Sequence, residues 1–92
     1  MNIGNAIKEI RKRKGISQKG LAKKIGMSTN NLCSIEKEKS FPSMENIKKI
    51  CGALEVTESI LLLFSITEDD IPAHKRELFH CLTDTLKNHI IE

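Results

Sequence analysis

The chain has 92 residues, 39% of them apolar, with fifteen Lys or Arg against twelve Asp or Glu and a formal net charge of +3. At roughly 100–200 residues per domain, this length holds one domain and a short appendage, which excludes a multi-domain enzyme. The longest apolar run, from Ile60 to Phe64, is far shorter than the roughly 20 residues of a membrane span. We therefore expect one small domain without a membrane partner.

Cysteine and histidine usage points to a reducing compartment and to no metal site. Cys33, Cys51 and Cys81 are odd in number and widely spaced, and no pair of them has a metal-ligand spacing. The histidines near the C-terminus do not complete such a set. No Ser–His–Asp or paired-carboxylate arrangement stands out either. We therefore expect free thiols, a cytoplasmic location, no enzymatic activity and no cofactor.

Charge is divided unequally between the two halves of the chain. Residues 1–50 hold twelve Lys or Arg and four Glu, a balance of +8, whereas residues 51–92 hold three basic and eight acidic residues, a balance of −5. A positive half joined to a negative half suggests one surface that faces a polyanion and a separate end that faces something else. A solvated, lysine-rich helical surface without a partner is the plainer alternative, and composition alone leaves the two about even.

The first element in chain order is an amphipathic helix. Ile3, Ile7 and Ile10 recur at three- and four-residue spacing and form one apolar face. Gly15 ends this helix, because glycine accepts the left-handed conformation of a C-terminal cap. The helical pattern continues through the rest of the chain, and no strand alternation competes with it.

The next two helices surround a tight turn. Ser17 caps a second helix that runs to Ile25, and Ser28 caps a third. Gly26 lies between them, where the short turn requires a positive φ that glycine adopts without penalty. A helix, a turn of this kind and a second helix match a helix-turn-helix. The residues expected to lock the two helices together are Leu21, Ala22, Leu32 and Ile35.

Two further helices complete the first domain. Pro42 marks a loop, and helices follow the capping residues Ser43 and Thr57. Residues 1–65 are therefore expected to form one helix-turn-helix domain. Residues 66–92 are expected to form a linker and a C-terminal amphipathic helix. The expected dimerisation residues on the apolar face of this helix are Leu78, Phe79, Leu82, Leu86 and Ile90.

An apolar face of this size is expected to be buried against another surface. On a monomer it would be an exposed patch, so the helix either folds back on its own domain or pairs with another chain. We favour a two-fold homodimer, because one helix-turn-helix reads few bases and pairing doubles the contacts at a spacing of about 34 Å. A docking site for a different, unknown protein is the other possibility.

From Ile3 to Phe64 the sequence resembles the Cro and phage-repressor type of helix-turn-helix regulators, the XRE family. The match keeps one unbroken register, which makes it far more specific than a lone short motif. It implies an all-α fold: a compact five-helix, lambda-repressor-like bundle followed by the C-terminal helix. The residues that carry the resemblance are Ile3-Gly4, Ile10-Arg11-Lys12, Gly15-Ile16-Ser17-Gln18, Leu21-Ala22, Ile25-Gly26-Met27-Ser28, Leu32, Ile35-Glu36, Pro42-Ser43 and Leu54.

The resemblance also implies roles for individual residues, with double-stranded DNA as the partner. Arg11 of the first helix is implied to pair with Glu36 at the end of the third. The implied base-reading residues are Thr29, Asn30, Asn31 and Ser34. The implied phosphate contacts are Ser17, Gln18, Ser28, Lys37, Lys39 and Ser40.

Two positions depart from the family pattern. Gly20 stands where a Glu commonly completes the capping box with Ser17, so the second helix loses a small stabilising contribution. Glu38 stands where a Gly usually follows the third helix, so we expect an exit loop of different shape and a charge that repels phosphate. Both departures bear on the contacts of Lys39 and Ser40, and neither threatens the fold.

The residue types on the outward face of the third helix agree with DNA binding. Asn pairs with adenine and Thr contacts the thymine methyl, and the absence of Arg there predicts half-sites that lean towards A·T. The sequence thus predicts a transcriptional regulator, a repressor that binds an inverted-repeat operator as a homodimer. The alternative is a protein-interaction module, antitoxin-like or antirepressor-linked, that uses the scaffold and the apolar tail to hold a partner. A nucleoid-type binder fits the lysines but leaves Asn30 without a role.

Overall fold

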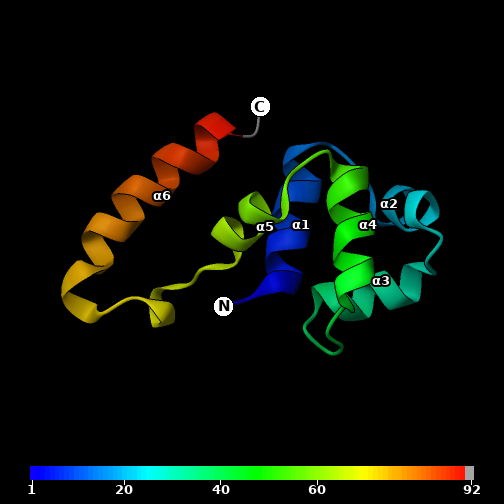
Figure 1. The fold of residues 1–92 in the computed structure, drawn as a ribbon, viewed down its shortest axis with the longest axis horizontal. Coiled ribbons are helices and arrows are strands. Elements are labelled where there is room, and N and C mark those ends of the chain that lie inside the picture. The colour runs from blue at the N-terminus through cyan, green and yellow to red at the C-terminus, as the bar shows by residue number, and fades with distance from the viewer. Residues whose placement is uncertain (91–92) are drawn as a thin grey trace.

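The computed structural model describes residues 1–90 as helices joined by short loops. The first five are α1 (Ile3–Arg13), α2 (Gln18–Ile25), α3 (Thr29–Glu36), α4 (Met44–Leu54) and α5 (Glu58–Ser65). Two short 3-10 helices, η1 (Glu68–Asp70) and η2 (Ala73–Lys75), lead into α6 (Arg76–Ile90). Helices α1 to α5 form a bundle, and α6 lies to one side of it (Figure 1). The expected all-α bundle with a C-terminal helix is confirmed.

Polar caps fix where the helices of the bundle begin. The hydroxyl oxygens of Ser17 and Ser28 accept the N–H of the residue three positions on, at 2.9 and 3.1 Å. Ser43 and Thr57 cap α4 and α5 in the same way, at 3.1 and 3.3 Å. Each cap satisfies one of the backbone donors that a helix start leaves without an intrahelical partner. Local sequence therefore sets the helix boundaries, including those around the turn between α2 and α3.

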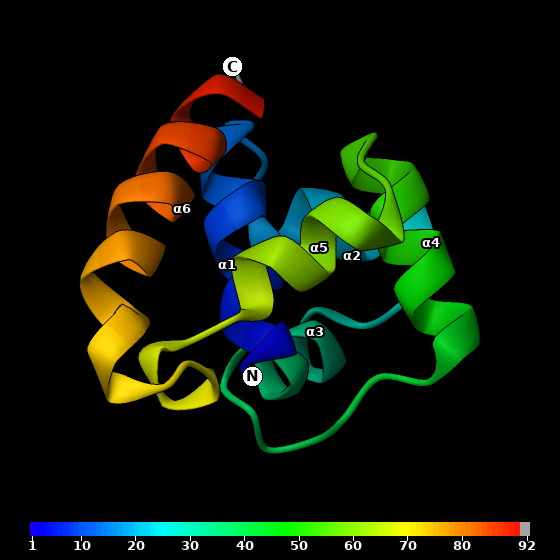
Figure 2. The same ribbon diagram turned by 60° about the vertical axis from the view of Figure 1, so that its left-hand side comes forward.

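The apolar core lies where α1 packs against α3 and α5 and where α2 packs against α3 and α4. In the view of Figure 2, α5 crosses in front of α1, and α6 and α4 lie on opposite sides of α1. The isoleucines expected on one face of α1 are all buried. The largest fully buried apolar side chains are Ile7, Ile10, Leu21, Leu32, Ile50, Leu54 and Leu61.

Gly4 of α1 lies against the end of α3. A Cβ atom there would overlap the carbonyl oxygen of Ile35 and would lie 2.9 Å from Glu38 Oε1. The Gly4 N–H donates a hydrogen bond of 2.8 Å to Glu38 Oε1. Only glycine fits this contact, which fixes how α3 sits on α1.

Helix α6 turns a polar face to the bundle and an apolar face outwards. Thr83 is buried and Lys87 is half-buried on the inner side. Phe79, which the sequence places on the apolar face, is instead half-buried at the edge of that face. The outer stripe consists of Leu78, Leu82, Leu86 and Ile90, each at least 40% exposed. Within residues 1–90, every helix is too short or too polar to cross a membrane.

Candidate nucleic-acid interface

Helices α2 and α3 meet at a turn that the local sequence determines. Gly26 ends α2 with a φ of +69°, the left-handed conformation that glycine adopts without strain. The Met27 N–H then donates to the carbonyl of Ala22 at 2.9 Å, and Ser28 starts α3. The four side chains expected to lock the two helices are all buried: Leu21, Ala22, Leu32 and Ile35. One face of α3 is thereby held in the bundle while the other stays outside.

The outer face of α3 presents polar side chains with free hydrogen-bonding groups. Thr29, Asn30 and Asn31 are exposed, and Ser34 is half-buried one turn further on. Within residues 1–90, the side chains of Thr29, Asn30 and Asn31 make no hydrogen bond; Asn31 is engaged only through its backbone N–H. Side-chain amides and hydroxyls in this state, on a rigid helix, are the groups that read base edges in a major groove.

The two capping serines lie at the starts of α2 and α3. Because the oxygens of Ser17 and Ser28 accept from the backbone, each hydroxyl hydrogen stays free to donate. Both side chains are exposed. Helix N-termini also carry free N–H groups and the positive end of the helix dipole, which favour phosphate oxygens.

Gln18 is more constrained than the sequence suggests. Its Nε2 donates to Glu36 Oε1 at 2.9 Å. One of the two amide N–H groups is therefore used inside the protein, and the other stays available to a phosphate. The contact orients the side chain at the start of α2.

A buried ion pair lies beneath the interface. Arg11 Nε donates to Glu36 Oε2 at 2.8 Å and Arg11 Nη2 donates to Glu36 Oε1 at 3.0 Å, while Nη1 reaches the carbonyl of Ile16 at 2.9 Å. The two side chains are 9% and 2% exposed. Such two-point pairing satisfies both carboxylate oxygens and fixes geometry. The pair thus ties the end of α3 to α1, and Gln18 extends it to α2.

The loop after α3 keeps its basic residues exposed. Contrary to the sequence expectation, Glu38 adopts the left-handed conformation that a glycine would take there, with a φ of +64°. Its carboxylate accepts the Gly4 N–H and so turns towards the start of α1. Lys37, Lys39 and Ser40 remain exposed around it. The negative charge of Glu38 is thereby directed to a helix N-terminus, where it is favourable.

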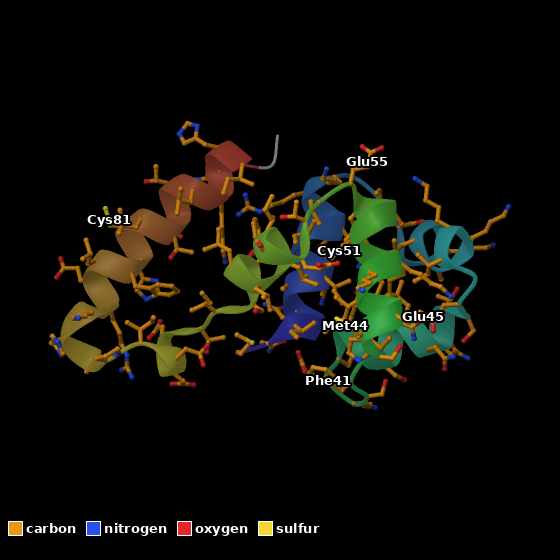
Figure 3. The ribbon with its side chains drawn as sticks, viewed as in Figure 1. Phe41, Met44, Glu45, Cys51, Glu55 and Cys81 are labelled. Atoms are coloured by element: carbon orange, nitrogen blue, oxygen red, sulfur yellow. The ribbon has the colours of Figure 1, made fainter. Side chains whose placement is uncertain are left out.

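The three cysteines differ in environment. Burial raises the pKa of the Cys51 thiol, and the negative charge of Glu58 raises it further, so Cys51 is an unreactive core residue. Cys33 is half-buried on α3, and Cys81 is exposed on the side of α6 away from the bundle (Figure 3). The described part of the chain, residues 1–90, brings together no group of three potential metal ligands.

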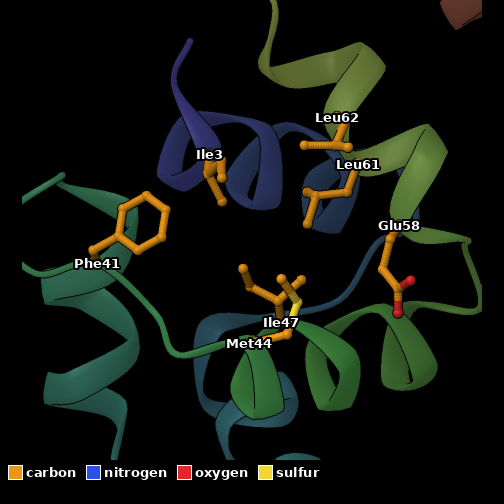
Figure 4. Close-up of a pocket in the computed structure, with 7 residues that line it drawn as sticks. All are labelled: Ile3, Phe41, Met44, Ile47, Glu58, Leu61 and Leu62. Atoms are coloured by element: carbon orange, nitrogen blue, oxygen red, sulfur yellow. The ribbon is translucent and has the colours of Figure 1, made fainter.

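An apolar pocket of about 320 Å³ opens between α1, α4, α5 and the segment after α3. Phe41 and Met44 at its rim are exposed, and Glu58 is the one charged residue of its lining. Figure 4 shows the lining: Ile3, Phe41, Met44, Ile47, Glu58, Leu61 and Leu62. A lining with a single carboxylate offers no acid–base pair and no activated nucleophile.

Comparison with known proteins agrees with this geometry. Two capped helices around a left-handed glycine, with a polar outer face on the second, define a helix-turn-helix of the DNA-binding type. Residues 7–61 match the family model described as Helix-turn-helix. The chain belongs to this family, and the resemblance to Cro and phage-repressor type regulators is confirmed. The match identifies a DNA-binding domain, not a catalytic one.

Its relatives are named as repressors and regulators. The chain is similar to the immunity repressor protein of Bacillus phage phi105, 34% identical over 62 residues, which is 67% of this chain and 43% of the phage protein. It is similar to the HTH-type transcriptional regulator SinR of Bacillus subtilis, 39% identical over 61 residues, 65% of this chain and 55% of the relative. The regulator ImmR of Bacillus subtilis is 31% identical over 62 residues, 67% of this chain and 49% of the relative. The chain thus matches about half the length of these relatives.

Proposed function

We propose that the protein is a cytoplasmic, sequence-specific transcriptional repressor that places α3 in the major groove of DNA. The observation that carries this proposal is the exposed polar face of α3, where Thr29, Asn30 and Asn31 have free side chains on a helix fixed by the Arg11–Glu36 pair. Asn and Thr have the hydrogen-bonding and methyl groups that distinguish A·T pairs in the major groove. The names of the relatives, an immunity repressor and transcriptional regulators, support the same function.

The phosphate contacts proposed for this complex flank the base-reading face. They come from both helix starts and from the loop after α3, which holds the positive charge closest in sequence to the recognition helix. Phosphate contacts of this kind position a protein on DNA without reading sequence. The proposed set is Ser17, Gln18, Ser28, Lys37, Lys39 and Ser40, beside the base-reading Thr29, Asn30, Asn31 and Ser34.

The Lys37→Gln/Lys39→Gln double variant is expected to bind duplex DNA more weakly and with less dependence on salt. Each phosphate contact contributes about 0.9 to the slope of log affinity against log salt, so losing two lowers the slope by about 1.8 per protomer. Fluorescence anisotropy with a labelled duplex, from about 50 to 200 mM salt, measures this slope. Lys75→Gln, which removes a lysine from η2, serves as the control and keeps the wild-type slope. An unchanged slope in the double variant would remove both lysines from the proposed phosphate set.

We also propose that the protein is a homodimer through the outer face of α6. A helix that packs on its own domain normally turns its apolar side inwards, whereas α6 leaves Leu78, Leu82, Leu86 and Ile90 each at least 40% exposed. The bundle offers no cover for the leucines, because its exposed large apolar side chains within residues 1–90 are Met1, Phe41, Met44 and Leu62. Phe41 and Met44 lie on the α3–α4 side of the bundle and not beneath α6 (Figure 3).

A second copy of the chain can bury the outer stripe of α6. Two-fold pairing of identical stripes buries both at once, and it presents two α3 helices to one duplex. Two recognition helices related in this way read half-sites of an inverted repeat, about 34 Å apart. The proposed contact residues are Leu78, Leu82, Leu86 and Ile90, with Phe79 at the edge.

Leu82→Glu is expected to convert the dimer into a monomer, because it places a charge in the middle of the apolar stripe on each copy. Sedimentation equilibrium at roughly tens of micromolar measures the mass. Leu62→Glu is the matched control, since Leu62 is 45% exposed on α5 and Leu82 is 54% exposed on α6. The control stays dimeric. Loss of the dimer in Leu62→Glu alone would place the interface at the apolar pocket, and a monomeric wild type would leave the α6 stripe to a different protein.

A further inference from the structure

The far end of α6 is held to the bundle by polar contacts. Lys87 Nζ lies 3.2 Å from Glu9 Oε1 and 4.9 Å from the centroid of the Phe64 ring. Arg13 Nη1 donates to the carbonyl of Lys87 at 3.3 Å and to Asn88 Oδ1 at 3.2 Å. The Arg13 guanidinium also lies over the Phe64 ring, 5.4 Å from its centroid. We call these five residues, Glu9, Arg13, Phe64, Lys87 and Asn88, the α6 clasp.

The near end of α6 is held independently by the linker. Arg76 Nε donates to the carbonyl of Glu68 at 3.1 Å. The linker is held in turn at the start of the chain, where the Met1 amino group lies 2.9 Å from Asp70 Oδ2 and lowers the pKa of that carboxyl. From Arg76 to Lys87 the helix rises about 17 Å. Anchors at two separated points fix the direction of a helix, whereas a single anchor leaves it free to pivot.

Phe64 is the one residue of the clasp that belongs to the core, and no clasp residue belongs to the outer stripe. Phe64 is 4% exposed, and the two cations lie over its ring. The side chains of Lys87 and Glu9 are 16% and 29% exposed, so their pairing is partly shielded from solvent. The clasp therefore determines how α6 is oriented relative to α3. The orientation of the outer stripe relative to α3 follows from it.

We infer that the α6 clasp sets the distance and rotation between the two helix-turn-helix units of the dimer, which makes Lys87 and Arg13 determinants of operator half-site spacing. This inference rests on the proposed homodimer. Each base pair inserted between half-sites moves them apart by about 3.4 Å and rotates them by about 35°. With α6 held in one orientation, the second helix-turn-helix unit cannot reach a half-site that has been moved. With an α6 that pivots on its linker, the second unit can reach the moved half-site, but its effective concentration there is lower.

The clasp can be detected by proton NMR in the protein without DNA. Lys87 Nζ lies over the Phe64 ring, 4.9 Å from its centroid, so we expect the ring current to shift the resonances of the neighbouring ε-methylene protons upfield. The wild type is expected to show this upfield shift, and Glu9→Gln is expected to reduce it because the ion pair that holds Lys87 is lost. Lys87 ε-methylene resonances at the ordinary lysine position in the wild type would overturn the inference.

Operator spacing tests the consequence. The two halves of a symmetric duplex site are moved apart or together by one to three base pairs, and affinities are measured for the wild type and Lys87→Met. The wild type is expected to lose about tenfold or more across the series and Lys87→Met less than about threefold, with both dimeric in sedimentation. Lys75→Met, outside the clasp, behaves as wild type. A dimeric Lys87→Met that discriminates as steeply as wild type overturns this inference alone, whereas a wild type indifferent to half-site spacing overturns both the inference and the proposed homodimer on an inverted repeat.

Discussion

Arg11→Met is expected to destabilise the protein by about 3–5 kcal/mol, because it leaves the Glu36 carboxylate buried without its partner. The carboxylate is 2% exposed, so water cannot replace the two hydrogen bonds from Arg11. Domains of this kind are stable by about 5–15 kcal/mol in total, so the loss removes a large fraction of that stability. Urea denaturation followed by far-UV circular dichroism measures the difference, with the slope of the transition unchanged.

The double variant Arg11→Met/Glu36→Leu distinguishes the loss of the ion pair itself from the penalty of leaving the Glu36 carboxylate buried without a partner. Replacing both partners with apolar residues of similar volume is expected to recover most of the stability lost in Arg11→Met. Gln18 loses its acceptor in this variant, so DNA affinity is expected to fall even where the fold is restored. A loss of stability below about 1 kcal/mol in Arg11→Met would contradict a buried ion pair, because an exposed ion pair contributes no more than that.

Asn30→Ala is expected to weaken specific DNA binding by about 1–3 kcal/mol for each half-site, since one bidentate contact to adenine is lost per protomer. In a dimer the two losses combine to about thirty-fold or more in affinity. Binding to random duplex is expected to stay unchanged because Asn30 carries no charge. The free energy of unfolding is also expected to stay within about 0.5 kcal/mol of wild type, since the side chain is exposed.

Competition titrations with the operator and with a scrambled duplex measure the two affinities separately. Asn5→Ala, an exposed asparagine on α1, is the matched control and keeps the wild-type discrimination between the duplexes. Equal weakening of Asn30→Ala on both duplexes would contradict base reading by this residue.

The helix-turn-helix could be predicted from the sequence because its determinants are local. Caps at Ser17 and Ser28 and the left-handed Gly26 act within a few residues of where they stand, so the pattern contains them fully. The buried faces follow from helical periodicity alone. Residues such as Thr29 and Asn30 are then exposed by elimination, because the opposite side of α3 is occupied by Leu32 and Ile35.

Long-range contacts could not be predicted in this way. Glu38 adopts a glycine-like conformation and binds the backbone of Gly4, thirty-four positions earlier, which no local pattern indicates. The bond from Gln18 to Glu36 likewise depends on how α2 and α3 meet. For helix α6, amphipathicity identifies the apolar face but does not indicate whether that face points towards the bundle or away from it. The contacts of Arg13 and Lys87, together with the burial of Thr83, show which side lies against the bundle.

Selection from random duplex DNA with the purified protein tests whether it binds a specific, two-fold symmetric site. It is carried out at roughly 150 mM salt, where non-specific binding is weak. We expect recovery of a two-fold symmetric site whose half-sites lean towards A·T, with enrichment lost in Asn30→Ala. No common sequence among the recovered duplexes, with affinity that simply fades as salt rises, would contradict a sequence-specific dimeric repressor.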